Sequence, residues 1–291
     1  MAGTLDGAFT ALVFITVALT SVAIGLVTRL DVIRAAVRRV SFWVVIIANL
    51  AVVPLLGYVV ARSMPLTPGV ESGVVLCAIC AAGPLGLKAS QISRSDLAWT
   101  LSLTVVLQIL NVLTLPMWSP VLLDRSLTVQ PGDLFGVLAI AILLPALVGG
   151  WSGRRGPRAA ERRSRKLTTV SNVTLVMAVI VGVAANAPEL ASSVSSWVLL
   201  TAIVVILAAG LVGWWPPEAA SRRRASALVT LNRATSVALL VVGRAFPENA
   251  EVFTAAVVFG LVQTAAAVAL SLYWRLSLGR STRFVEAGVT R

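Results

Sequence analysis

Two cationic side chains, Lys88 and Arg233, lie inside apolar stretches of this 291-residue chain. On insertion scales a charge at the centre of a membrane-spanning helix costs about 2.5–3.5 kcal/mol, so such a residue is a functional-site hypothesis by default. Both lie beside sequence that interrupts a helix, because a Gly-Pro-Leu-Gly run covers 83–86 and a polar run covers 230–236. Interrupted backbone at membrane depth is tolerated only inside protein or beside a water-filled cavity. We therefore predict that the two broken segments meet at one buried site.

A site of this kind suits an anion, because helix N-termini at a break add partial positive charge to that of the two side chains. A buried lysine can release its proton and so couple binding to pH, whereas an arginine keeps its charge. The predicted ligand is the carboxylate or sulfonate of a small organic anion. The predicted substrate-binding residues are Lys88, Arg233, Asn232, Ser90, Gln108 and Gln263. The alternative is that both cations only bind carbonyl groups at the C-terminal ends of the broken half-helices.

The composition is that of a polytopic membrane protein, with 58% hydrophobic residues, 12% charged residues and a mean hydropathy of +0.92. The net charge of +12 does not indicate nucleic-acid binding, because the basic residues lie in short loops between apolar segments. The chain has no histidine, and its two cysteines cannot complete a metal site unaided. No Asp-rich cluster or HExxH motif is present, so the sequence predicts neither an enzyme nor a need for a cofactor.

Nine apolar segments, each long enough to cross a bilayer, predict an all-α polytopic membrane protein. Their approximate limits are 7–28, 41–62, 70–92, 97–122, 134–152, 167–187, 194–215, 225–246 and 250–275. The first segment lacks the basic region of a cleaved signal, so we expect a retained helix. Residues 1–291 then form a single membrane domain.

Basic and acidic residues alternate between successive loops. The loops after the first, third, fifth and seventh segments, with the C-terminal tail, hold 19 of the 24 basic residues. The opposite loops hold Glu71, Asp124, Asp133, Glu189, Glu248 and Glu251. The positive-inside rule then places the N-terminus outside and the C-terminus in the cytoplasm. We expect a plasma membrane location. Because arginines are many and lysines few, we expect this membrane to be a bacterial inner membrane. The lipid bilayer is an expected partner, and the sequence predicts no obligate protein partner.

The segments also suggest internal symmetry, because the first four and the last four are separated by one segment and therefore run in opposite directions. Lys88 and Arg233 fall in the third and eighth segments, which are corresponding members of the two groups. The next segments carry Gln108 and Gln263. Inverted repeats with broken helices are typical of secondary transporters. The two spacings differ, 20 residues against 30, so the sequence alone leaves the symmetry incomplete.

Several stretches together resemble the bile acid:sodium symporter family. One runs from Pro84 through Lys88 to an Asp-Leu-Ala motif at 96–98 and on to Pro116; another is Asn-Arg-Ala-Thr-Ser-Val-Ala-Leu-Leu at 232–240, followed by Phe-Pro at 246–247. Pro54 and the short basic segment after the first span also fit. The resemblance extends over nearly the whole chain and rests on loose motifs.

The resemblance implies a ten-span fold of two inverted repeats, here without the first span, as in nine-span members. A panel domain would comprise about 7–28, 134–152 and 167–187. A core domain would comprise about 41–122 and 194–275 and contain two crossing discontinuous helices. Transport would proceed by alternating access, through movement of the panel against the core.

The sodium ligands that the resemblance implies are only partly present. Asn49, Thr100, Thr104 and Thr230 are the residues that look like parts of an ion site. The pattern expects a Ser-Asn run where this chain has Gly-Leu at 86–87, and acidic and amide ligands where it has Val229 and Arg233. Coulomb repulsion disfavours a buried sodium ion beside an uncompensated cation. We therefore hypothesise that Lys88 and Arg233 replace bound sodium with tethered charge.

These observations favour a secondary active transporter of an organic anion with weakened or lost sodium coupling. An ordinary sodium-dependent symporter and a passive uniporter or channel of the same fold are the alternatives. A membrane enzyme is disfavoured by the lack of catalytic motifs.

Overall fold

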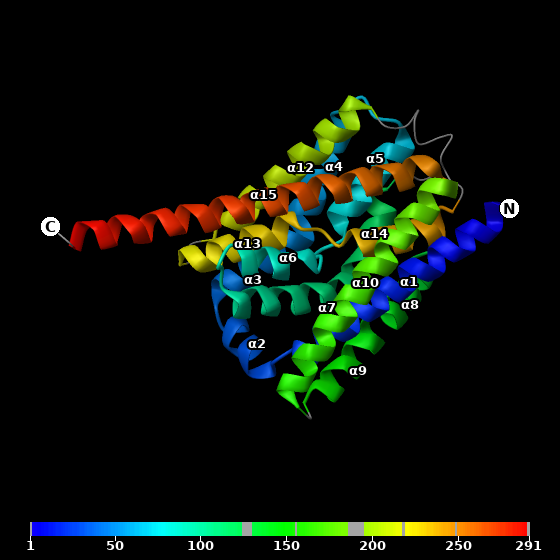
Figure 1. The fold of residues 1–291 in the computed structure, drawn as a ribbon. Helices are drawn as coiled ribbons and strands as arrows, with labels where there is room; N and C mark the ends of the chain where they lie inside the picture. The colour runs from blue at the N-terminus through cyan, green and yellow to red at the C-terminus, as the bar shows by residue number, and fades with distance from the viewer. Residues whose placement is uncertain are drawn as a thin grey trace.

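The computed structural model describes residues 2–123, 130–154, 156–185, 195–216, 219–247 and 249–289. All regular structure in these ranges is helical (Figure 1). The acidic residues Asp124, Glu189 and Glu248, and the ends of the segments expected at 167–187 and 194–215, lie partly or wholly outside the described residues.

The first half of the chain contains α1 (Ala2–Val27), α2 (Leu30–Val37), α3 (Val40–Ile47), the π-helix η1 (Ala48–Val52), α4 (Val53–Arg62), α5 (Pro68–Ile79), α6 (Leu85–Ile92) and α7 (Leu97–Leu122). The second half contains α8 (Pro131–Leu138), the π-helix η3 (Ala139–Leu143), α9 (Leu144–Gly153), α10 (Pro157–Ala185), α12 (Ser196–Trp214), α13 (Ala220–Leu231), α14 (Thr235–Ala245) and α15 (Ala250–Val289).

Eight helical segments of the described chain are long and apolar enough to cross a membrane. The third segment expected from the sequence, 70–92, is instead divided into α5, of 12 residues, and α6, of eight. The basic loop after α1 contains a short helix, α2, which hydropathy does not reveal. Large apolar side chains such as Ile47, Val59 and Leu147 remain about 60–70% exposed on the outside, as expected for a surface that faces lipid.

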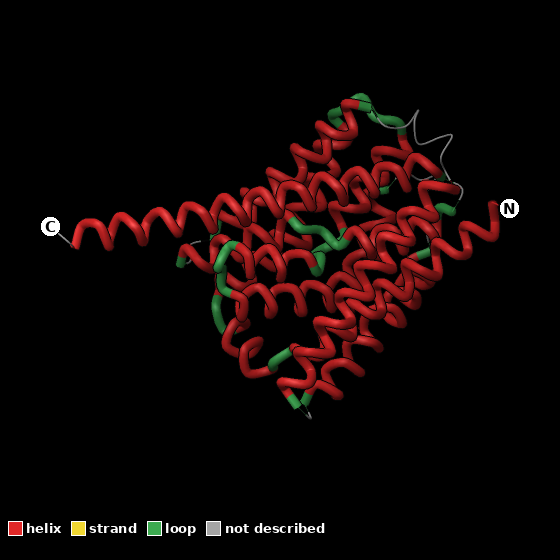
Figure 2. The backbone as a smooth tube through the Cα atoms, viewed as in Figure 1, coloured by secondary structure: helices red, strands yellow, loops and turns green. Residues whose placement is uncertain are grey.

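Two non-helical breaks lie in the interior of the bundle, surrounded by helices (Figure 2). The break between α5 and α6 covers residues 80–84, and the break between α13 and α14 covers residues 232–234. The two breaks hydrogen bond to each other, because the Gly83 N–H donates to the Asn232 carbonyl at 2.8 Å and the Ala234 N–H donates to the Cys80 carbonyl at 2.9 Å. Each break thereby satisfies backbone groups that the other leaves without a helical partner.

A second group of helices is formed by α1, α9 and α10, with α1 lying along both of the others (Figure 1). Glycines bring α1 and α9 into backbone contact: a Cβ added at Gly25 or Gly149 would overlap the carbonyl oxygen of Ala146 or Val22. Such close approach through small residues is a common way for helices to pack in membranes. On the other side, the Thr16 hydroxyl donates to the Thr174 hydroxyl of α10 at 2.8 Å.

The contact between the two breaks depends on the lack of a side chain at Gly83. A Cβ at this position would lie 2.5 Å from the Arg233 carbonyl oxygen and 3.0 Å from Asn232 Oδ1. We predict that Gly83→Ala separates the breaks and destabilises the protein by about 1–3 kcal/mol, as overpacking usually does. Thermal unfolding in detergent measures the change. Gly136→Ala is the control, since a Cβ there meets nothing within 4 Å; equal melting temperatures for the two variants would contradict the prediction.

Candidate functional site

The Arg233 side chain is enclosed at the crossing of the two broken helices and is 1% exposed. Its Nη1 donates to Asn49 Oδ1 at 2.8 Å and to the Thr230 carbonyl at 3.5 Å. Its Nη2 donates to the Ala78 carbonyl at 2.5 Å and to the Asn49 carbonyl at 3.2 Å. One guanidinium group therefore connects α5, α13 and the π-helix η1.

Each of these carbonyl oxygens is available for a local reason. Ala78 and Thr230 lie in the last turns of α5 and α13, where carbonyls have no helical partner. The Asn49 carbonyl is free because the chain continues through Pro54, which has no N–H to donate back to it. The Val53 N–H bonds to Ala48 five residues earlier, which widens this turn into a π-helix.

The positive charge of the guanidinium also balances the partial negative charge of the helix ends that it contacts. Each half-helix C-terminus carries a partial charge of about −0.5, so the converging ends of α5 and α13 together approach the charge that one guanidinium neutralises. Asn49 completes the enclosure, because its Nδ2 donates to Thr230 Oγ1 at 2.9 Å while its Oδ1 accepts from Arg233. Among the predicted residues, Asn49, Thr230 and Arg233 are thus brought together.

The backbone of each break is held by an amide side chain from a neighbouring long helix. Asn111 of α7 accepts from the Ala81 N–H at 3.2 Å, and Gln263 of α15 accepts from the Arg233 N–H at 2.9 Å. Both amides lie 30 residues after the N–H that they bind. Gln263 also donates to the Arg233 carbonyl and to Thr235 Oγ1.

Asn111 was not predicted from the sequence, where Gln108 was matched with Gln263 instead. Gln108 lies elsewhere: its nearest described partner is Ser21 of α1, at 3.5 Å. The common spacing of 30 residues between each break and its amide is the signal that identifies Asn111 as the counterpart of Gln263.

A cavity of about 510 Å³ lies on the other side of the crossing, where α6 and α14 begin. Lys88 of α6, Asn232, Arg233 and Gln263 line it. The facing wall belongs to α10, which contributes two polar residues, Thr168 and Asn172, and four apolar residues, Leu175, Val176, Val179 and Ile180. The cavity thus lies between α10 and the helices that carry the two breaks.

Asn232 is a residue of the cavity lining whose side-chain amide has no described hydrogen bond. It is 1% exposed and lines the cavity, and neither its Oδ1 nor its Nδ2 has a hydrogen-bond partner in the part of the chain that the structure describes. Leaving buried polar atoms unpaired costs about 1–3 kcal/mol, so such a group calls for a partner from outside the chain. Together with Lys88 and two helix N-termini, this amide gives the cavity a polar end suited to an anion.

The remaining predicted residues form a separate cluster between α6 and α7. The Thr100 hydroxyl donates to Ser90 Oγ at 2.9 Å, and the Thr104 hydroxyl donates to the Thr100 carbonyl of its own helix. All three side chains are fully buried. They do not line the cavity of about 510 Å³ and do not contact the guanidinium group among the described interactions.

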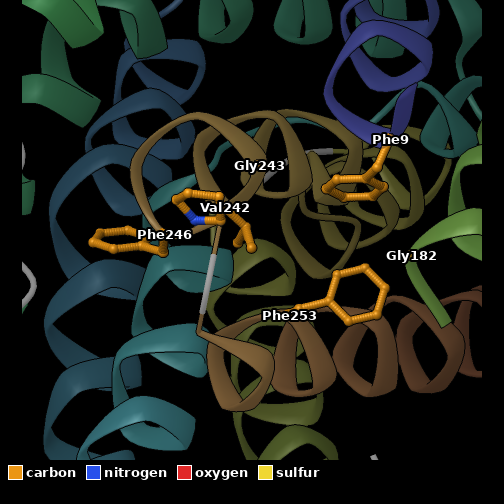
Figure 3. Close-up of a pocket in the computed structure, with 7 residues that line it drawn as sticks. Phe9, Gly182, Val242, Gly243, Phe246 and Phe253 are labelled. Carbon is orange, nitrogen blue, oxygen red and sulfur yellow. The ribbon is translucent and has the colours of Figure 1, made fainter. Parts of the chain in front are cut away.

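At the end of the bundle where α1 and α15 begin and α10 and α14 end, two aromatic rings pack closely (Figure 3). Phe9 of α1 and Phe253 of α15 meet edge to face with ring centroids 5.3 Å apart. Gly182 and Gly243 make room for them, since a Cβ at Gly182 would lie 2.5 Å from the Phe253 ring and one at Gly243 would lie 2.8 Å from the Phe9 ring. The space left between them is about 10 Å³, at the lower limit for one water molecule.

The fold and the site together define a polytopic helical membrane protein with a buried polar crossing beside a cavity. The family model of the sodium bile acid symporter family matches residues 12–193, well over half of the chain. The chain belongs to this family of membrane transporters. The match begins within α1, includes all of α2 to α10 and ends before the second break, so Arg233 lies outside it. No curated protein matches the sequence.

Gln263 binds the backbone of a break and Gln108 does not, and this difference can be tested by substituting each with leucine. Gln263→Leu removes three hydrogen bonds at the second break, and Asn111→Leu removes the single bond at the first. We expect each to destabilise the protein by about 1–3 kcal/mol, with Gln263→Leu the larger effect, because a buried N–H loses its acceptor. Gln108→Leu should cost less than about 1 kcal/mol. Denaturant unfolding monitored by tryptophan fluorescence measures all three, and a cost for Gln108→Leu matching that of Gln263→Leu would contradict the assignment.

Proposed function

We propose that this protein is a secondary active transporter that carries an organic anion, of carboxylate or sulfonate type, by alternating access. The observation that carries the proposal is the cavity of about 510 Å³ at the N-terminal ends of α6 and α14, lined by Lys88 and by the unpartnered amide of Asn232. Half-helix N-termini that converge on a midplane cavity are the usual substrate site of transporters with broken helices.

The lining of the cavity favours an anion with an apolar body. Its polar groups gather near the crossing and at Thr168 and Asn172, whereas Leu175, Val179, Leu239 and Val257 present hydrocarbon. A ligand bound here would place its charged group at Lys88 and the helix N-termini. Its body would lie against α10, whose position then depends on whether the site is filled.

We further propose that α1, α8 to α9 and α10 act as the panel and that the helices around the two breaks act as the core, within an inverted repeat of nine spans. The two half-helix carbonyls bound by the guanidinium, those of Ala78 and Thr230, are 152 residues apart, and so are the two amides, 111 to 263, which supports the repeat. With the N-terminus outside the cell, the Phe9–Phe253 contact would close the cavity from the outside. The many arginines beside only two lysines favour a bacterial plasma membrane.

Sodium coupling is the family property that this chain fits least. Carbonyl and amide oxygens are the ligands that a hard cation needs, and at the crossing those of Ala78, Thr230 and Asn49 already accept hydrogen bonds from Arg233. A sodium ion there would also meet the repulsion of a buried guanidinium. We propose that the guanidinium of Arg233 takes the place of a bound ion at this position and serves a structural role. Lys88, by contrast, would contact the substrate.

A passive uniporter or channel of the same fold is the second candidate, favoured by the fixed cation at the crossing. Counterflow identifies a channel, because any carrier loaded with unlabelled anion accumulates labelled anion transiently, whereas a channel does not. A uniporter is distinguished from an active transporter because it does not accumulate the anion against its own gradient.

The first prediction from this proposal concerns Lys88. Hexanoate, succinate, hexanesulfonate and taurocholate serve as probes, since a ligand can stabilise only by binding the folded state. We expect at least one to raise the melting temperature equally in sodium and potassium buffers, and Lys88→Ala to weaken its binding about tenfold or more, or about 1.4 kcal/mol. The control is Lys166→Ala, which removes the chain's other lysine, an exposed residue of α10. Undiminished binding by Lys88→Ala would overturn the proposed site.

The second prediction concerns Arg233. Arg233→Ala leaves several buried carbonyls unpaired, at about 1–3 kcal/mol for each that finds no new partner, so the melting temperature should fall. Guanidinium ion at low millimolar concentration, or sodium, should restore part of the loss by occupying the vacated position, and neither should stabilise the wild type. Arg34→Ala, at an exposed position of α2, controls for charge alone. Sodium-specific stabilisation of the wild type would contradict the proposal and favour an ordinary sodium symporter.

A further inference from the structure

Apart from the cavity beside the crossing, a large groove opens on the outer surface of the bundle, between α12, α13 and α15. Its volume is about 590 Å³. Its lining is almost entirely apolar and extends from Ile206 to Trp214 on α12 and from Ala266 to Trp274 on α15. Small residues such as Gly210, Ala227 and Ala269 form depressions between larger ones. Leu207, Leu211 and Tyr273 remain about 60–70% exposed, so the groove faces the surroundings of the protein and not its interior.

The groove has a long axis along α12. It extends from Ile206 to Trp214, eight residues of helix and therefore about 12 Å. Half of a bilayer's hydrocarbon core is about 15 Å thick. A groove of this length and apolar lining matches one acyl chain within one leaflet.

One end of the groove carries aromatic and cationic groups. The rings of Trp214 and Trp274 stack with centroids 5.5 Å apart. The Arg223 guanidinium lies 4.7 Å above the Trp214 ring, and its Nε donates to the Trp214 carbonyl at 3.2 Å. Tryptophans with an adjacent arginine are typical of the boundary between hydrocarbon and headgroups. This end therefore lies at headgroup depth, and the opposite end, at Ile206, lies towards the middle of the membrane.

The charge near this end is positive. Arg224 follows Arg223 at the start of α13, and Arg275 follows Trp274 on α15. Arg222 does not add to this charge, because it forms an ion pair with Asp96 at 3.3 Å. Within the described residues Nε is the only side-chain nitrogen of Arg223 with a described hydrogen bond, which leaves its Nη groups to bind a ligand. A guanidinium binds phosphate oxygens in a planar, two-point geometry.

We propose that the groove binds an anionic phospholipid, with one acyl chain along α12 and its phosphate at Arg223. The charge at this end selects an anionic lipid over a zwitterionic one, since a basic residue near a membrane surface contributes about 1 kcal/mol with anionic lipids. This proposal does not rest on the proposed transport function. The lipid would join α12 and α13 to α15 at the position where α15 leaves the body of the protein (Figure 1).

The test compares phosphatidylglycerol with phosphatidylcholine of the same acyl chains, by retention in native mass spectrometry and by melting temperature in mixed micelles. We expect the wild type to retain phosphatidylglycerol preferentially. Arg223→Gln should weaken that retention about fivefold, the equivalent of about 1 kcal/mol, and Arg223→Lys should largely preserve it. Gly210→Leu should fill the groove and weaken retention of both lipids, and it is sterically compatible because a Cβ there meets Leu231 at an ordinary 3.7 Å.

Arg34→Gln is the matched control, because it removes one positive charge from an exposed position away from the groove. The proposal is overturned if both lipids are retained equally by the wild type, or if Arg34→Gln weakens retention as much as Arg223→Gln. It is also overturned if Gly210→Leu converts a dimer into a monomer without changing lipid retention, which would make the groove an interface between two copies of the chain.

Discussion

One guanidinium group holds together three parts of the chain that leave carbonyl oxygens unpaired at the same depth. Arg233 binds the ends of two half-helices, at Ala78 and Thr230, and the turn that Pro54 opens at Asn49. Each unpaired carbonyl would be costly away from water. The crossing of the two breaks is therefore possible because a single planar group with several donors reaches all of these oxygens.

This interaction divides the crossing into two sides of different polarity. The helix C-termini face the guanidinium, so their partial negative charge is compensated within the protein. The helix N-termini of α6 and α14 face the cavity, where Lys88 and the unpaired amide of Asn232 add to their positive character. The negative ends of the half-helices are thus compensated by Arg233, and the positive ends at the cavity are where the proposed organic anion would bind.

Hydropathy predicted the long helices, and the Gly-Pro-Leu-Gly run at 83–86 and the polar run at 230–236 predicted the two breaks, because membrane crossing and helix interruption depend on local composition. They did not predict which groups Arg233 binds, since that depends on carbonyls from α5 and η1 that come close only in the folded chain. Asn111 was missed because a single amide in an apolar helix has no local signature, and Gln108, three residues earlier, looked equivalent. Among the residues predicted to bind substrate, Lys88 and Gln263 are two that line the cavity. Ser90, Thr100 and Thr104 instead bind one another or their own helix.

The difference between the two cations has a consequence for energy coupling in the proposed transporter. A bound sodium ion couples transport to its gradient because it enters and leaves with each cycle, whereas a guanidinium tethered at Arg233 remains in place and transfers no charge. In the proposed transporter Arg233 therefore stabilises the crossing of the two breaks without supplying a driving force. Any coupling to an ion gradient must involve a group other than this guanidinium.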